Sequence, residues 1–216
     1  MKNFFNEELQ APNVMTVSVD LEVAKEALVF CSEASAETVS VVSPQWKSDI
    51  RWISPNSLHS FKTFYSIFKR LRIARHVREF VELSQDVRMY SGFLVTRSNC
   101  AQADFHVDWR DTGNEAFTLI TPISENYKGF GLLYKRADGS TAEYEYKPGE
   151  AIIFGDSFLH STKPGRADDP VVLLSFTFGS DNMQHWPKIS KTAASQGNMV
   201  RMPDGRFQIH DIDAMD

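Results

Sequence analysis

The chain has 216 residues, of which 42% are hydrophobic and 24% charged, and its formal net charge is −5. These values are typical of one globular domain and exclude a disordered chain. The negative charge argues against nucleic acid as the main partner, because phosphate binding needs clustered positive charge. No apolar run approaches the roughly 18 residues of a membrane span. Two cysteines make no disulfide framework, and acidic residues stand where a signal peptide would be apolar, so we expect a cytoplasmic protein.

Residues 1–86 are expected to be mainly helical and to support the rest of the chain. Asp20 is placed to cap a helix through LEVAKEALVF, and TVSVV at 38–42 has the composition of a strand. From Ser57 to Val81 apolar residues recur every three or four positions, which predicts one long amphipathic helix or two with a break. We interpret the basic residues among them as the solvent-exposed face of that helix.

Residues 87–180 change to short extended runs separated by turns. Asp138-Gly139 between two such runs is a strong hairpin signal. Seven or eight strands at this spacing predict an antiparallel sandwich or barrel, and the double-stranded β-helix, the jelly roll of cupin-like proteins, is one such closure. The polar tail, residues 181–216, has a possible hairpin at 203–205. We therefore predict an α+β fold with residues 1–216 as one domain and the N-terminal helices packed on a jelly roll.

The segment around His106 and Asp108 carries the main chemical signal. In a strand, alternate residues share a face, so these two side chains would point together while their apolar neighbours point away. An imidazole and a carboxylate on one face can bind one metal ion, and His160, 54 residues later, is the candidate third ligand. Two histidines and one carboxylate suit non-haem iron(II) and dioxygen chemistry. A chance His-x-Asp pair remains an equal alternative on these residues alone.

The same residues resemble a known superfamily. The pair His106-x-Asp108, followed by PGEAIIFGDSFLH ending at His160, is similar to the iron(II)/2-oxoglutarate-dependent oxygenases. The second stretch resembles the aspartyl/asparaginyl β-hydroxylase and prolyl-hydroxylase branches, although the first of these usually lacks the carboxylate that Asp108 supplies. The resemblance covers roughly residues 88–180. It implies that His106, Asp108 and His160 are the iron ligands, that 2-oxoglutarate and O2 are co-substrates with ascorbate in support, and that an unactivated C–H bond is hydroxylated.

A bound 2-oxoglutarate also needs a cation for its distal carboxylate. Many members of this superfamily carry an Arg about ten residues after the distal His, but residues 168–173 contain no Arg or Lys. Another branch of the superfamily draws this cation from the fourth strand of the jelly roll, and by similarity to that branch Lys128 is our first candidate, with Arg97 in the strand before the metal segment as our second. Tyr90 begins the strand that contains Arg97 and could add a hydroxyl. The loop residues that remain as alternatives are Lys163 and Arg166.

The expected substrate is a small molecule, such as an amino acid or a metabolite that carries a carboxylate. Trp109, Arg110 and the loop 111–114 follow the acid ligand and are candidates for substrate contact. A peptidyl or protein residue is the alternative substrate, because the distal-His stretch resembles branches that hydroxylate proteins. A non-catalytic cupin-like module that binds a metal or small molecule, or another cupin-type enzyme, is the alternative function. We expect no nucleic-acid or membrane partner, and the oligomeric state stays open.

Overall fold

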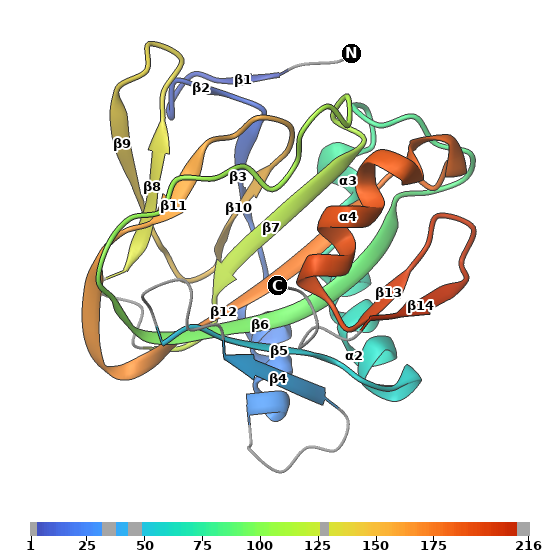
Figure 1. Ribbon diagram of the computed structural model, residues 1–216, viewed down its shortest axis with the longest axis horizontal. Coiled ribbons are helices and arrows are strands. Elements are labelled where there is room, and N and C mark those ends of the chain that lie inside the picture. The colour runs from blue at the N-terminus through green and yellow to red at the C-terminus, as the bar shows by residue number, and fades with distance from the viewer. Residues whose placement is uncertain (1–3, 32–37, 43–48, 126–129, 211–216) are drawn as a thin grey trace.

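The computed structural model describes residues 4–31, 38–42, 49–125 and 130–210. Its centre is a seven-stranded sheet in which every neighbouring pair is antiparallel (Figure 1). In sheet order its strands are β3 (Val14–Ser18), β10 (Glu150–Phe154), β7 (Ala116–Pro122), β12 (Gly165–Gly179), β6 (Arg88–Cys100), β5 (Arg51–Pro55) and β4 (Thr38–Val42).

A smaller antiparallel sheet faces the central part of the first. Its order is β11 (His160–Thr162), β8 (Gly131–Lys135) and β9 (Thr141–Glu145). Two short hairpins complete the strands, β1 (Phe5–Asn6) with β2 (Ala11–Pro12), and β13 (Met199–Arg201) with β14 (Phe207–Ile209). The mainly antiparallel α and β composition that the sequence predicts is confirmed.

The two faces of the large sheet bury different sets of side chains. On β12, Leu173 points to the smaller sheet and packs with Phe93 of β6 and Leu132 of β8. Phe176, three residues further along β12, points to the opposite face and packs onto helix α2 (Leu58–Arg70). This alternation follows from the two-residue period of a strand. It leaves one packed layer between the sheets and another between the large sheet and the helices.

The helices of the N-terminal part begin largely where the sequence predicts. Asp20 caps α1 (Leu21–Lys25) by accepting the main-chain N–H groups of two residues, and a 3-10 helix follows at Glu26–Cys31. The amphipathic stretch forms two helices, α2 and α3 (Ala74–Val77), and Arg72 between them has a φ of +54°. A positive φ ends a right-handed helix, which accounts for the break.

Residues 1–86 are not helical support alone, and this expectation needs correction. They contribute β3, β4 and β5 to the large sheet, so the N-terminal part supplies three of its seven strands. Of these, only β4 was expected from the sequence. Strands β3 and β5 were missed because their burial does not alternate: two adjacent residues of β3 are half-buried, and the last three residues of β5 are all buried.

The C-terminal segment contains a helix that the sequence analysis missed. Helix α4 (Trp186–Gln196) has a proline at its start and lies near the N-terminal half of β6 (Figure 1). The hairpin expected at residues 203–205 is present as β13 and β14.

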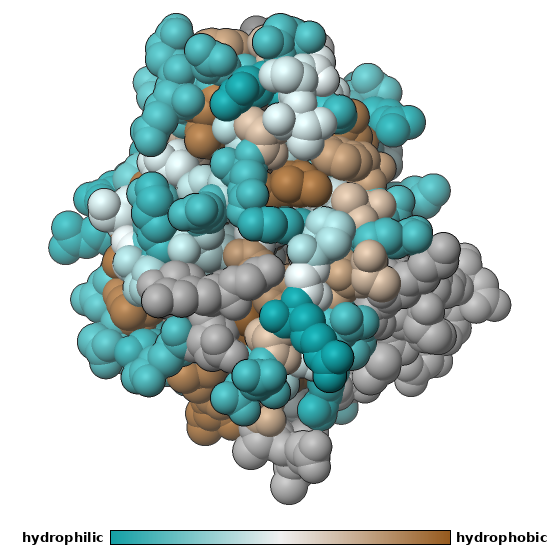
Figure 2. Space-filling model, turned by 90° about the vertical axis from the view of Figure 1, so that its left-hand side faces the viewer, coloured by the Kyte–Doolittle hydropathy of each residue, from teal (hydrophilic) through white to brown (hydrophobic). Residues whose placement is uncertain are grey.

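The outer face near β8 and β9 is mostly hydrophilic, with apolar side chains in small separate areas (Figure 2). Strand β9 accounts for part of this, because Thr141, Glu143 and Glu145 are exposed while Tyr144 between them is buried. Among the described helices, none is long and apolar enough to cross a membrane.

Candidate metal centre

Three side chains of the expected triad converge at one end of the space between the sheets. Asp108 Oδ1 lies 3.7 Å from His106 Nε2 and 3.8 Å from His160 Nε2. The nearest donor atoms of all three residues lie within 4.8 Å of one another. His106 is the exposed member, with 36% of its side chain accessible, whereas Asp108 and His160 keep 8% and 5%. The group is therefore open to solvent on one side only.

The main chain sets the positions of both imidazoles. His106 and His160 form a reciprocal bridge, in which each N–H donates to the other's carbonyl oxygen at 2.8 and 2.9 Å. Each ring then places Nδ1 against a carbonyl two residues earlier, Asp104 O at 2.9 Å and Phe158 O at 3.0 Å. A carbonyl only accepts, so both Nδ1 atoms donate and the lone pair of a neutral ring is on Nε2, toward Asp108.

The segment that carries His106 and Asp108 is not the strand that the sequence predicts. Within residues 102–109 a single bridge at His106 joins it to β11. Further contacts hold it, among them Asp104 N donating to Ser161 Oγ at 2.7 Å and Ser157 N donating to Trp109 O at 3.0 Å. The predicted convergence of the two ligand side chains nevertheless holds.

The carboxylate of Asp108 has one oxygen in use and one directed at the histidines. Thr118 of β7 donates its hydroxyl to Asp108 Oδ2 at 2.7 Å, and Trp109 Nε1 donates to that hydroxyl at 3.0 Å. Trp109 is fully buried, so its interpretation as a substrate contact is wrong. Its role here is to orient Thr118.

Burial favours the neutral form of the inner histidine. Loss of solvent lowers the pKa of His160; nearby Asp108 opposes the shift and His106 adds to it. The aromatic rings of Phe154 and Phe158, 4.5 and 5.6 Å from the His160 ring, make this dry environment. A neutral imidazole is the form that binds a metal.

The three donors fit a metal ion better than they fit one another. Separations of 3.7 and 3.8 Å exceed a hydrogen bond, yet they suit neighbouring ligands around one ion. Two imidazoles and one carboxylate are the donor set of non-haem iron(II) sites that keep open positions. The arrangement can therefore hold a ferrous ion and leave room for further ligands.

A half-buried cation, Arg97, lies between the sheets. On β6 it shares the parity of Phe93 and Val95, which point to the smaller sheet, and its Nη1 donates to the hydroxyl of Thr162. Its Nε is buried without a hydrogen-bond partner among the described residues, while the side chain also bonds Cys100 and is attracted by the carboxylate of Asp49. Burial lowers the pKa of Arg97, opposed chiefly by the nearby Tyr146 phenol.

Arg97 lies close to the place where the superfamily pattern expects an arginine. It is in register with Val171 of β12, eleven residues after His160, so it enters from the neighbouring strand. Thr162 follows His160 by two residues on β11, a step of roughly 6.5 Å with both side chains on one face. The guanidinium of Arg97 and the triad thus lie at the two ends of the same inner face of β11.

The other candidates for the cation site are placed elsewhere or not placed. Lys128, the first choice from the sequence, lies outside the described residues. The ammonium of Lys163 is paired with Glu143 at 2.6 Å, and Arg166 is exposed. Tyr90 is fully buried and its hydroxyl donates to Ser180 O at 2.8 Å, so it does not carry a free hydroxyl to the site.

Sequence reasoning also missed Asp156, which organises the loop after the acid ligand. Its carboxylate accepts the Gly113 N–H at 2.7 Å, the Asn114 N–H at 3.3 Å and the hydroxyl of Thr112. Thr112 and Asn114 are buried, which corrects the idea that loop 111–114 as a whole contacts substrate. No local pattern marks this role, because the partners of Asp156 lie 42 to 44 residues earlier in the chain.

Asp156→Ala is expected to lower the free energy of unfolding by about 3 kcal/mol, because several buried donors would lose their acceptor. Chemical denaturation at neutral pH measures this. Asp138→Ala is the control, since that exposed side chain accepts only a local bond from Ser140, and it should cost less than about 1 kcal/mol. Equal effects in the two variants would contradict this role for Asp156.

A scan against protein-family models finds no match, and neither does a sequence search of the curated proteins. Solved structures do match in fold. The α-ketoglutarate-dependent epimerase SnoN of nogalamycin biosynthesis has a TM-score of 0.61 at 12% identity, covering 78% of this chain and 79% of its own. HygX from Streptomyces hygroscopicus, with nickel and 2-oxoglutarate bound, has a TM-score of 0.59 at 12% identity, covering 82% and 88%.

A third structure, a prolyl-4-hydroxylase from Pseudomonas putida, has a TM-score of 0.52 at 16% identity, covering 78% of this chain and 92% of its own. A Burkholderia pseudomallei structure that matches at 0.57 is described as a member of the 2OG-Fe(II) oxygenase family. This chain therefore has the fold of the 2OG-Fe(II) oxygenases.

Proposed function

We propose that the protein is an iron(II)- and 2-oxoglutarate-dependent oxygenase that hydroxylates a small molecule. One observation carries this proposal: the Nε2 atoms of His106 and His160 and Oδ1 of Asp108 converge with their second donor atoms already engaged. Such pre-orientation of ligands is typical of metal sites. The fold shared with 2OG-Fe(II) oxygenases supports the same conclusion.

We further propose that the strands close as a double-stranded β-helix. Strands β6, β12, β7 and β10 form the core of the large sheet, and β11, β8 and β9 face them. The segment with His106 adds to the smaller sheet through its bridge to His160. Eight segments in two facing antiparallel sheets are the number and arrangement that a jelly roll requires.

His106, Asp108 and His160 would hold the ferrous ion, which would supply the oxidation of a C–H bond by dioxygen with 2-oxoglutarate as co-substrate. Thr118 keeps Asp108 Oδ2 occupied, so that Oδ1 is presented to the ion. Phe154 and Phe158 keep water from the inner side of His160. The exposed side, at His106, is where a substrate would enter.

Arg97 is proposed to bind the distal carboxylate of 2-oxoglutarate. The Nε of Arg97 is buried without a hydrogen-bond partner in the described part of the chain, which is energetically unfavourable and would be relieved by a bound carboxylate. Thr162, already a partner of Arg97, adds a hydroxyl at the same place. The dicarboxylate would then extend from the triad to Arg97 along the inner face of β11.

The proposed substrate class follows the structural neighbours. SnoN has been solved with nogalamycin RO and HygX with hygromycin B, both small molecules. We therefore keep a small molecule, such as an amino acid or carboxylate metabolite, as the proposed substrate. The likeness to a prolyl-4-hydroxylase keeps a peptidyl residue as the alternative.

Succinate formation tests the proposal without knowledge of the substrate. The purified protein, supplied with iron(II), 2-oxoglutarate and ascorbate, should release succinate slowly, and N-oxalylglycine should raise its melting temperature. Metal binding without succinate formation or stabilisation by N-oxalylglycine would favour a non-catalytic cupin-like module. Absence of metal binding would contradict both.

A further inference from the structure

Helix α4 reaches the candidate metal centre through one side chain. Thr192 Oγ1 donates to the main-chain oxygen of Asp108 at 2.7 Å, across 84 residues of sequence. Asp108 is thus held at two points, its carboxylate by Thr118 on β7 and its backbone by Thr192 on α4. The first contact sets the direction of the carboxylate, and the second sets the position of the residue.

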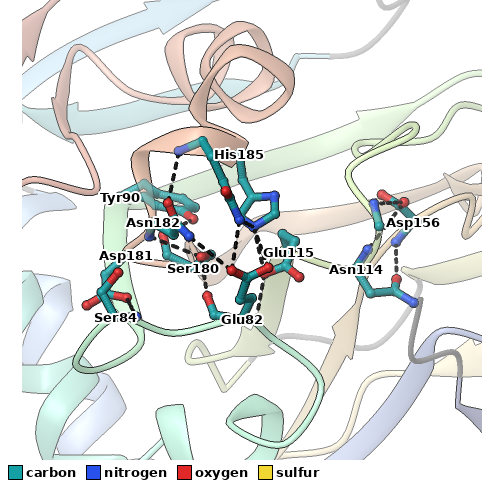
Figure 3. A network of polar contacts seen from close by, with 12 residues as sticks. Glu82, Ser84, Tyr90, Asn114, Glu115, Asp156, Ser180, Asp181, Asn182 and His185 are labelled. Carbon is teal, nitrogen blue, oxygen red and sulfur yellow. Dashed lines mark hydrogen bonds and ion pairs between the residues drawn. The ribbon is translucent and has the colours of Figure 1, made fainter.

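The N-terminal end of α4 is anchored by a polar network. His185 lies between two carboxylates, with Nε2 3.3 Å from Glu82 Oε2 and 4.0 Å from Glu115 Oε2 (Figure 3). Asn182 and Gln184 donate to the other oxygen of Glu82 at 3.2 and 2.8 Å. These pairings account for the Glu-Glu-His group as an ionic anchor, so we do not interpret it as a second metal site.

Apolar packing continues along the helix. Trp186, Ile189 and Ala193 are buried in one cluster with Tyr90 and with Trp109. Since Trp109 follows Asp108 directly, the helix contacts both the residue that binds the ion and its neighbour. Movement of α4 would therefore shift Asp108 relative to the two histidines.

Packing of the C-terminal end of α4 buries polar atoms that have no hydrogen-bond partner within the part of the chain that the structure describes. Gln196 Oε1, Ser91 Oγ and Thr177 Oγ1 are buried there without hydrogen-bond partners. Ser91 and Thr177 are opposite each other in the β6–β12 register, and Gly197 packs so closely that a Cβ on it would lie 2.3 Å from Ser91 Oγ. Buried polar atoms without partners favour the undocked helix, whose ends water can reach.

We propose that α4 is a positioning element for the metal-binding carboxylate, and that metal binding and docking of α4 are coupled through Thr192. The inference rests on the proposed function only for the role of Asp108 as a ligand. An ion that fixes Asp108 also fixes the acceptor of the Thr192 bond. The coupling must be reciprocal, so an ion stabilises the docked helix by as much as the docked helix strengthens ion binding.

Hydrogen exchange and metal titration, with Ni(II) as the probe, test this coupling in the full chain. In the wild type, Ni(II) should slow amide exchange within residues 186–196. Thr192→Val keeps the side-chain shape but removes the donor, so it should weaken Ni(II) binding about 10-fold and abolish the slowing. It should also change the visible spectrum of the Co(II) form, whereas Thr192→Ser should restore all three properties.

Ser195→Ala is the matched control, because its hydroxyl bonds only within the helix, to Thr192 O. It should behave as the wild type. If the wild type binds no Ni(II), the proposed metal site fails and the inference fails with it. If the wild type binds Ni(II) but exchange in α4 is unchanged, the coupling is overturned while the proposed function stands. A Thr192→Val protein that is merely less stable, with unaltered affinity and spectrum, would also overturn it.

Discussion

Replacing His106, Asp108 or His160 by Ala should lower the affinity for iron(II) more than about 100-fold and abolish succinate formation. Loss of a residue that merely orients a ligand already costs 10- to 100-fold, so loss of a ligand should cost more. Isothermal titration with Co(II) or iron(II) under anaerobic conditions measures the affinity, and circular dichroism reports whether the fold is kept.

The matched control is His59→Ala, because His59 is exposed on α2 and makes no contact with the triad. It should bind one ion with wild-type affinity. A triad variant with unchanged stoichiometry and affinity would remove that residue from the site. Wild-type affinity in all three variants would place the metal elsewhere.

Arg97→Met should have two opposite effects. The apparent Michaelis constant for 2-oxoglutarate should rise by one to two orders of magnitude, since a lost charge-assisted hydrogen bond is worth about 1.5–3 kcal/mol. Without 2-oxoglutarate the variant should melt at the same or a higher temperature than the wild type, because it lacks a buried N–H group that has no hydrogen-bond partner among the described residues. Iron affinity should stay unchanged.

Thermal melts with and without 2-oxoglutarate, in the Ni(II) form, separate these effects. Arg166→Ala serves as control, being an exposed arginine at the start of β12, and should leave both properties unaltered. A defect in Lys128→Ala together with wild-type behaviour of Arg97→Met would return the anion site to the segment 126–129. A lower melting temperature of Arg97→Met without 2-oxoglutarate would show that the contact of Arg97 with Thr162 stabilises the fold, and would contradict the second effect.

How far the sequence could predict this structure depended on how local each signal was. Asp20 and Ser57 cap helices through bonds to residues two or three positions away, so both starts could be predicted. Strands β7 to β10 and the second half of β12 could be predicted because glycine or proline marks the turns beside them, whereas β11, three residues long, was not predicted. Helix α4 was missed because its buried stripe is thin, with Ala193 and Ala194 in place of large apolar residues.

The site shows the same division. The side chains of His106 and Asp108 converge as the two-residue alternation predicts, even though a single bridge replaces the strand. Arg97 could be named only as a second choice, because its placement depends on the register of β6 with β12, which no local pattern specifies. Thr118, Thr192 and Asp156 act across 10 to 84 residues of sequence, and only the folded chain brings them to their partners.

The pairing of β3 with β10 has a consequence for how the protein folds. Val14 lies opposite Phe154 and Ser18 opposite Glu150, so one edge of the large sheet joins the two halves of the chain. Such distant contacts form only after long loops have closed, and loop closure costs conformational entropy. Proteins rich in these contacts fold slowly, with folding times of about milliseconds to seconds. The β8–β9 hairpin can form early, but His106, Asp108 and His160 should meet only once the sheets have closed. An ion added to the unfolded chain should therefore do little to speed refolding, while one added later should slow unfolding.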